Sequence, residues 1–194
     1  VDIEYFTLRP ASDAPTMIYT GGMNMFANRD AVEWFLDGAW PLVKAEIPEA
    51  RFIAVGQSPS ALVLAAAQAD PHVEVPGFVD DVRPWVARAA VYVMPLRVGG
   101  GTRLKMVDAM AQGKAIVATR LGAEGIAGDD GVHFRLADDA QAFARTIVEL
   151  LRDPAQRQRL GTAARARAES HYAWPGLAAR LVAGYEQVLR GNAR

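Results

Sequence analysis

The fold follows from one stretch of the sequence, residues 91–114, which reads VYVMPLRVGGGTRLKMVDAMAQGK. Its first four residues are apolar and β-prone, which predicts a buried strand. Three glycines then lead directly into residues 103–112, where apolar side chains recur at helical spacing. Thr102 is the expected N-cap of this helix, and Gly113 is its expected left-handed C-terminal residue. A strand, a glycine-rich loop and a helix in this order are typical of one unit of a parallel α/β sheet.

The same unit recurs on both sides of this stretch. Short apolar runs predict further strands at residues 17–20, 51–55, 73–75, 115–118 and 131–136. Helical patterns separate these runs, and each run is nearly all apolar, as in strands that helices cover on both faces. We therefore expect an α/β fold, a Rossmann-like three-layer sandwich with a parallel sheet of about six strands, formed by residues 1–194 as a single domain.

The other helices are expected to start at residues that can cap a helix, or at prolines in its first turn. Such residues precede each remaining helical pattern. They give starts near Asn28 (with a kink or restart at Pro41), at Ser58-Pro59, at Asp80 or Asp81, at Asp138, at Asp153-Pro154 and after Trp174-Pro175-Gly176.

Composition excludes several classes of protein. The 194 residues carry a formal net charge of −1, which is too balanced for a nucleic-acid or membrane-surface binder that works by charge. The chain has no Cys, which excludes thiolate catalysis and fits a reducing compartment. No apolar stretch reaches the roughly 20 residues of a transmembrane segment. We expect a cytoplasmic protein and, because Val1 opens mid-pattern without an initiator Met, a fragment of a longer one.

The glycine-rich loop is the leading candidate for an anion-binding site. Gly99, Gly100 and Gly101 let the backbone approach a ligand, and their N–H groups can form a concavity at the helix N-terminus. Arg103 and Lys105 lie in the first turn, where a cation opposes the helix dipole. The presence of these two cations would be explained if they neutralise a bound diphosphate. The alternative is a flexible loop with solvated basic side chains.

A carboxylate lies one turn further along the same helix. Asp108 falls off the apolar stripe, where it could accept two vicinal hydroxyls, as from a ribose. The alternative is a surface ion pair with Lys105, three residues earlier, which would contribute only about 0.2–0.5 kcal/mol.

Ligands of open parallel sheets bind beyond the carboxyl ends of the strands, and two further loops lie there. Gly21-Gly22 either admit a ligand or form a tight turn. Phe78 either edges a base pocket or packs into the core. The dinucleotide and P-loop fingerprints do not occur, and the three histidines share no ligand spacing, so no metal site is expected.

Motifs at four places carry a family resemblance: Gly21-Gly22, Gly77-Phe78-Val79-Asp80, Met94-Pro95 and above all residues 99–119, GGGTRLKMVDAMAQGKAIVAT. Together they resemble the C-terminal domain of retaining glycosyltransferases of the glycogen-synthase and sucrose-synthase-like group, the glycosyl transferases group 1. The likeness covers nearly the whole chain. It implies one half of a GT-B enzyme, in which two Rossmann-like domains face each other across a cleft and the C-terminal one holds the nucleotide-sugar donor.

The resemblance also implies roles for the residues around the ribose and the sugar. Asp108 stands where the family has the second Glu of its E-x7-E motif, which binds the donor ribose. The first Glu, which contacts the donor sugar, falls at Gly100, so that contact is missing or supplied differently.

The remaining matches concern the base and the phosphates. Val79 and Leu96 match positions that edge the base, and Gly101 and Thr102 match backbone positions near the phosphates. The family has an Arg in the loop after its first strand, which helps to hold the diphosphate, and this Arg has no counterpart here. Arg103 and Lys105 would compensate for its absence.

The expected function is binding of a UDP- or GDP-sugar donor without cofactor or metal, for glycosyl transfer. The acceptor, a glycan or lipid-linked molecule, would bind to a missing N-terminal domain. The helices of residues 154–194 would brace that domain, which could lie at the inner membrane. The chain alone would then be inactive, and it assigns no catalytic residue. Two alternatives are an isomerase domain like the sugar-nucleotide 2-epimerases and a non-catalytic nucleotide-sugar-binding module. An oxidoreductase is disfavoured by the failed dinucleotide fingerprint.

Overall fold

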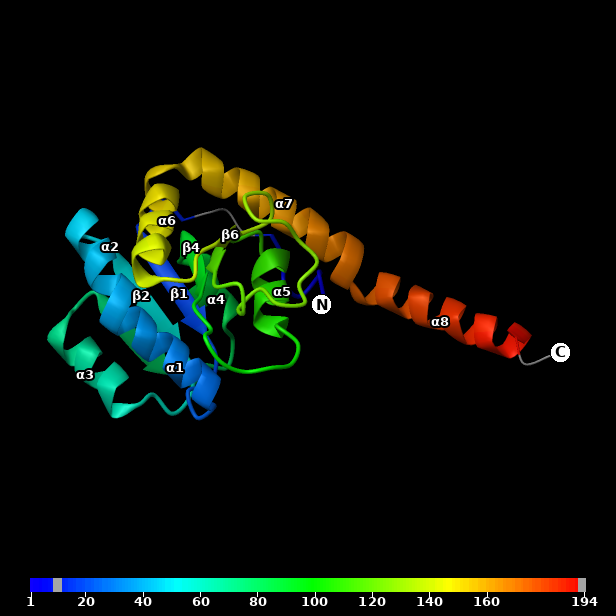
Figure 1. Ribbon diagram of the computed structural model, residues 1–194, viewed down its shortest axis with the longest axis horizontal. Helices are drawn as coiled ribbons and strands as arrows, with labels where there is room; N and C mark the ends of the chain where they lie inside the picture. The colour runs from blue at the N-terminus through cyan, green and yellow to red at the C-terminus, as the bar shows by residue number, and fades with distance from the viewer. Residues whose placement is uncertain (9–11, 192–194) are drawn as a thin grey trace.

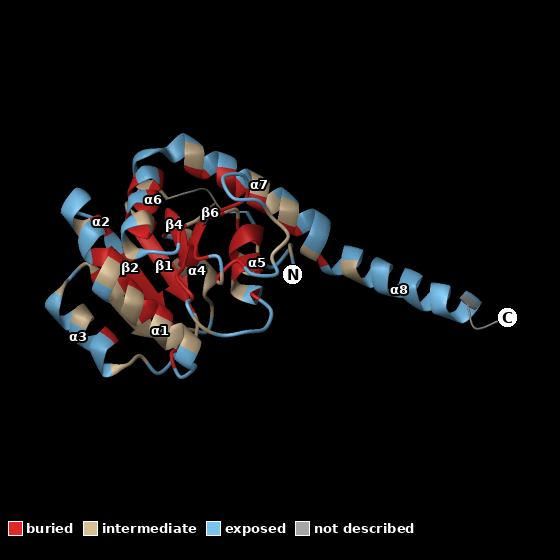
Figure 2. Cartoon of the chain, viewed as in Figure 1, coloured by how far each residue is buried: buried red, intermediate tan, exposed pale blue. Residues whose placement is uncertain are grey.

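A six-stranded parallel sheet forms the centre of the molecule in the computed structural model, which describes residues 1–8 and 12–191. The strand order is β3-β2-β1-β4-β5-β6 (Figure 1). The strands are β1 (Thr16–Thr20), β2 (Arg51–Val55), β3 (Val73–Gly77), β4 (Val91–Met94), β5 (Ala115–Ala118) and β6 (Arg135–Leu136). β1, β4 and β5 are buried along their whole length (Figure 2). The predicted α/β fold is confirmed.

Helices cover both faces of this sheet. α1, α2 and α6 pack together on one face, and α5 packs against α7 on the other, as right-handed crossovers require. The helical elements are α1 (Phe26–Trp34), the π turn η1 (Phe35–Ala39), α2 (Trp40–Glu46), α3 (Ala61–Ala69), α4 (Arg83–Ala87), α5 (Leu104–Ala111), α6 (Ala140–Arg152), α7 (Pro154–Tyr172) and α8 (Trp174–Gly191). α8 projects away from the body of the molecule (Figure 1).

Several predicted helix starts are confirmed. The first helix begins at Phe26, and the restart at Pro41 takes the form of η1, in which Trp40 N–H bonds the Phe35 carbonyl. Asp153 caps α7 by accepting from Gln156 N–H at 2.8 Å, with Pro154 in the first turn. Proline lacks an N–H, so it costs no hydrogen bond there.

Three predicted caps are wrong, each by one or two residues. Ser60, not Ser58, caps α3, because Ser58 has a φ of 56° and lies in the turn before it. Asp139 caps α6, while Asp138 instead accepts from Arg120 N–H. α5 begins at Leu104 without a side-chain cap, so Thr102 stays in the loop.

The remaining differences are small. Asp81 accepts from the N–H of Arg83, the first residue of α4, but the N-cap position itself belongs to Val82. Gly113 has the predicted left-handed conformation, with a φ of 69°. β6 is shorter than expected, and an isolated bridge between Asp130 and Phe134 precedes it.

The sheet topology fixes where a ligand can bind. β1 pairs with β2 on one side and with β4 on the other, so the order of strands reverses between β1 and β4. Loops that leave the carboxyl ends of these two strands diverge to opposite faces and leave a crevice between them. The loops that contain Gly21-Gly22 and Gly99-Gly100-Gly101 are the two that flank this crevice.

Candidate functional site

The two glycine-containing loops approach each other at this crevice. A Cβ atom added to Gly99 would lie 3.0 Å from the Cβ of Ala27, in the first turn of α1. Gly99 and Gly101 have φ values of 108° and 86°, which side chains rarely tolerate. The glycines at these two positions are therefore required by the path of the loop, as well as by any ligand that approaches it.

Lys105 connects the two loops. Its side chain reaches from α5 to the end of β1, where a Cβ on Gly21 would overlap the Nζ atom. The ammonium thus occupies the space that a side chain at position 21 would need. Gly21-Gly22 consequently do more than form a tight turn, since they admit a cation from an element more than 80 residues away in sequence.

Two further residues, which the sequence analysis missed, hold this ammonium in place. Lys105 Nζ donates to Tyr19 Oη at 2.9 Å and to Asn28 Oδ1 at 2.6 Å. Burial and, to a smaller extent, the nearby Arg103 charge together lower the pKa of Lys105 to about 8. Tyr19 sits in an apolar strand and Asn28 in a helix, so only the tertiary fold shows that they belong to the site.

Arg103 has a different place from the one expected. Its side chain is only 6% exposed, and its guanidinium donates to the carbonyls of Gly99, Gly100 and Leu121 at 3.1–3.2 Å. Glu124 lies 3.5 Å from the same guanidinium. Arg103 therefore braces the glycine-rich loop from behind, and the alternative of a solvated basic side chain is wrong for this residue.

Asp108 lies half-buried on α5, one turn beyond Lys105. Burial raises the pKa of its carboxyl group to about 6. Among the described residues Asp108 takes part in no ion pair, and Lys105 bonds Tyr19 and Asn28 instead, so the alternative of a surface pair between Asp108 and Lys105 is wrong. The carboxylate is left available to accept hydrogen bonds from a ligand.

The residues expected around the base are distributed unevenly. Phe78 is 70% exposed, so the alternative of core packing is wrong for this ring. Val79 is half-buried against the core, and the Leu96 side chain is almost fully buried while its carbonyl accepts from Thr119 Oγ1. Thr102 is exposed in the loop. Val79, Phe78 and Leu96 follow β3 and β4, so they share the carboxyl edge of the sheet with the other site residues.

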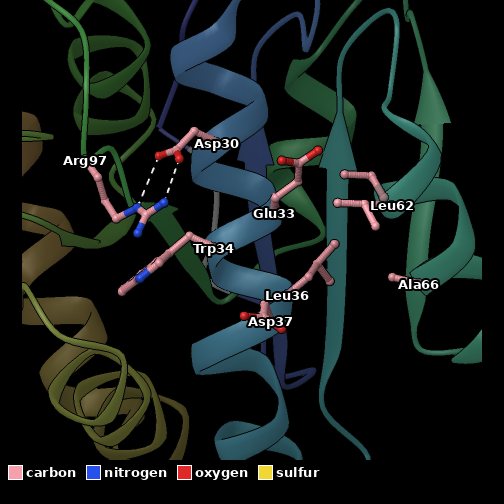
Figure 3. A pocket seen from close by; sticks show the side chains of 9 residues that line it. Asp30, Glu33, Trp34, Leu36, Asp37, Leu62, Ala66 and Arg97 are labelled. Carbon is pink, nitrogen blue, oxygen red and sulfur yellow. Dashed lines mark hydrogen bonds and ion pairs between the residues drawn. The ribbon is translucent and has the colours of Figure 1, made fainter.

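Two grooves lie between helices, and the first of them is also bordered by Arg97 of the loop after β4. One, of about 560 Å³, runs between α1 and α3 and is bordered by Trp34, Leu62 and the ion pair of Arg97 with Asp30 (Figure 3). The other, of about 540 Å³, lies between α2 and α6. Within residues 1–8 and 12–191 we find no cluster of acidic or histidine side chains that could hold a metal ion. In the same residues, no helix is long and apolar enough to span a membrane.

The sequence and the fold match known proteins. Residues 14–153 match the family model described as glycosyl transferases group 1. The MMP alpha-(1->4)-mannosyltransferase of Mycolicibacterium hassiacum is 40% identical over 92 residues, which are 46% of this chain and 22% of that protein. The phosphatidyl-myo-inositol mannosyltransferase of Mycolicibacterium smegmatis is 33% identical over 156 residues, 77% of this chain and 40% of that protein.

A solved structure shows the same fold. The crystal structure of Anabaena Alr3699/HepE in complex with UDP superposes with a TM-score of 0.79 at 16% identity, over 96% of this chain and 56% of that one. The chain thus spans less than half the length of the two mannosyltransferases. Since the family model covers most of its residues, the chain belongs to the glycosyl transferases group 1 family.

Proposed function

We propose that this chain is the donor-binding domain of a glycosyltransferase, and that it binds a nucleoside-diphosphate sugar in the crevice between β1 and β4. The observation that carries the proposal is the position of the Lys105 ammonium, which lies beside Gly21 and bonds Tyr19 and Asn28. A diphosphate in the crevice would meet this cation and the N–H groups of the loop. Asp108, further along α5, would accept the ribose hydroxyls.

The chemistry that these residues support is departure of a nucleoside diphosphate. As the bond between sugar and diphosphate breaks, negative charge grows on the leaving phosphate oxygens. Lys105 and the loop amides are already positioned to stabilise that charge, so the scheme requires neither a metal nor a cofactor. Arg103 contributes indirectly by holding the loop carbonyls away from the crevice.

The comparisons support transfer over the alternatives. Two relatives are named mannosyltransferases, and a structure of the same fold was solved with UDP. This favours a transferase over the isomerase alternative, and a UDP- or GDP-sugar over other donors. The combination of Lys105 and Asp108 in one crevice argues against a module that has lost its donor site.

We extend the proposal to the acceptor, which would be a glycan or a lipid-linked molecule held by an N-terminal domain. One relative is named for phosphatidyl-myo-inositol, and such an acceptor would place the enzyme in the cytoplasm at the inner membrane. Val1 bonds to the junction of α7 and α8 through Tyr172 and Trp174. A preceding domain would therefore emerge beside α8, whose exposed apolar side chains could brace it; these are Leu181, Val182, Tyr185, Val188 and Leu189.

Calorimetric titration of the chain with UDP, GDP, ADP and NAD tests the proposal. We expect binding of at least one nucleoside diphosphate and a loss of at least about tenfold in affinity for Lys105→Met, because a charge-assisted bond to phosphate is removed. Lys44→Met is the matched control and should bind as the wild type does, because this half-buried lysine of α2 bonds the Pro48 carbonyl and, within the described residues, has no hydrogen bond or ion pair with the crevice. Binding of NAD alone, or of none of the four by folded protein, would contradict the proposal.

A further inference from the structure

Asn28 is the centre of a hydrogen-bond cluster at the crevice. Its Oδ1 accepts from Tyr19 Oη at 2.7 Å and from Lys105 Nζ at 2.6 Å, and its Nδ2 donates to the Gly22 carbonyl at 2.8 Å. Lys105 Nζ also lies 4.5 Å from the centre of the Tyr19 ring. One amide side chain thus fixes the lysine, the tyrosine and the glycine loop relative to one another.

All partners of the Lys105 ammonium in this cluster are neutral. Burial raises the pKa of Tyr19, so its phenol stays protonated. No carboxylate forms an ion pair with Lys105 within the part of the chain that the structure describes. A cation withdrawn from water usually has an anionic partner, so the half-buried Lys105 is an uncompensated positive charge beside Gly21.

The charged and titratable groups around it do not change this balance. Arg103, just before α5, adds a second positive charge. Asp108 lies one turn further along α5, and Asp30 on α1 is bound to Arg97 at 2.6 Å. Tyr92 of β4 bonds Thr20, and burial raises its pKa as well. The field at Lys105 is therefore positive, which disfavours its protonated form and favours an incoming anion.

We propose that Asn28 is a positioning residue that holds Lys105 at the diphosphate site while leaving its charge uncompensated, so that the ligand itself supplies the counter-charge. This inference rests on the proposed function. An aspartate at position 28 has nearly the same shape and could hold the same ammonium, but its carboxylate would neutralise the charge of Lys105. The neutral amide is thus the property that matters.

A consequence is that ligand binding takes up protons. At pH 8, close to the lowered pKa of Lys105, part of the Lys105 side chains are neutral in the free protein. A bound diphosphate would favour the ammonium form and raise the pKa of Lys105, so binding at this pH draws a proton from the buffer. If Asn28 had only a structural role, placing a charged residue at position 28 would not change the proton uptake that accompanies ligand binding.

The test compares the wild type with Asn28→Asp by calorimetry at pH 8, in two buffers with different ionisation enthalpies. The probe is whichever of UDP, GDP and ADP binds the wild type most tightly. We expect the wild type to take up a measurable fraction of a proton per ligand. Asn28→Asp should bind at least about tenfold more weakly and take up almost none, because its carboxylate already keeps Lys105 protonated.

The matched control is Asn24→Asp, which adds the same charge four residues earlier, in the loop that precedes α1. Asn24 accepts from Gln57 at 3.3 Å and has no hydrogen bond to Lys105 in the described structure. We expect near wild-type affinity and proton uptake. Equal losses in the Asn24 and Asn28 variants would overturn the inference, and so would wild-type binding without proton uptake.

A second variant protects the test against a folding defect. Asn28→Ala removes the cluster without adding charge, so it should bind more weakly while proton uptake remains. If Asn28→Asp does not fold, wild-type affinity in Asn28→Ala overturns the inference. If folded wild-type protein binds none of the three nucleotides, the proposed function is overturned as well. If the wild type binds and the Asn28 variants bind with the same affinity, only the positioning role is overturned.

Discussion

At the scale of single residues, the site depends on two groups whose pKa values burial shifts in opposite directions. Burial lowers the pKa of Lys105 to about 8 and raises that of Asp108 to about 6. The lysine should therefore be charged below pH 8, and the aspartate above pH 6. Affinity for a nucleoside diphosphate should be highest between these two values and should fall on both sides.

Asp108→Asn tests the acidic limb of this profile. We expect about a tenfold or greater loss of nucleoside-diphosphate affinity at pH 7, because charge-assisted bonds to the ribose are lost. The fall in affinity below pH 6 should disappear with it. Calorimetry from pH 5 to 9 measures both effects, and an unchanged acidic limb would contradict the assignment.

The same substitution should not weaken the fold. The pKa of Asp108 in the folded protein lies above the ordinary aspartate value of 3.8, so its stabilising contribution is complete below pH 3.8 and is lost as the pH rises through about 6. At pH 7 the buried charge is a cost that asparagine removes. We expect an equal or higher Tm, and a pure stability loss without weaker binding would refute a ligand role.

Arg103 should behave in the opposite way, because its bonds are to the protein. Arg103→Met leaves the Gly99, Gly100 and Leu121 carbonyls without their charged donor, at a cost of about 2–4 kcal/mol in the free energy of unfolding. Urea titration measures this cost. Arg120→Met, at an exposed surface pair with Asp138, should change stability by less than about 1 kcal/mol. Equal effects in the two variants would show that Arg103 does not brace the loop.

At the scale of helices and strands, the pattern of apolar residues predicts the elements more accurately than the capping residues predict where helices begin. The apolar runs predict six parallel strands correctly, because strands covered on both faces cannot carry polar residues. Caps fail where neighbouring residues compete. Asp138 and Asp139 are chemically identical, and only the contact of Asp138 with Arg120 decides which one caps α6. Thr102 loses its predicted role because Arg103 folds back onto the loop, a contact that no local pattern encodes.

α7 packs closely against the turn that follows α5. A Cβ on Gly161 of α7 would overlap the backbone carbonyl oxygen of Gly113, two residues past the end of α5. We expect Gly161→Ala to destabilise the fold by about 1–3 kcal/mol through overpacking. Gly184→Ala, on the exposed part of α8, meets nothing within 4 Å and should raise helicity slightly. Thermal melts followed by circular dichroism distinguish the two, and a neutral Gly161→Ala would show that the helices can separate at no cost.

At the scale of the whole molecule, the site is assembled from loops that the chain order keeps far apart. The topology explains why sequence reasoning located Lys105 and Asp108 but missed Tyr19 and Asn28. The first two lie on one glycine-flanked helix with an unusual charge in its first turn. Tyr19 and Asn28 have no local signal, because their role exists only once β1 and β4 are neighbours.

α8 contributes little to the folded body. Residues 178–190 are all exposed, and the helix projects away from the sheet (Figures 1 and 2). A chain that ends at Ala173 should therefore keep its Tm within about 3 °C, since little apolar area is lost from the core. Its affinity for nucleoside diphosphates should be unchanged. Differential scanning calorimetry checks the first expectation, and a drop of more than about 5 °C would mean that α8 packs against the body.

The overlap between Gly21 and Lys105 has a consequence for how this protein can vary. A glycine in a surface loop ordinarily looks replaceable wherever space is open around it. Here the space beside Gly21 is already occupied by an ammonium from another helix. Any side chain at position 21 would displace that cation, and the φ of 151° at Gly21 would add backbone strain. We therefore expect substitutions at this position to lower both ligand affinity, through Lys105, and the stability of the fold.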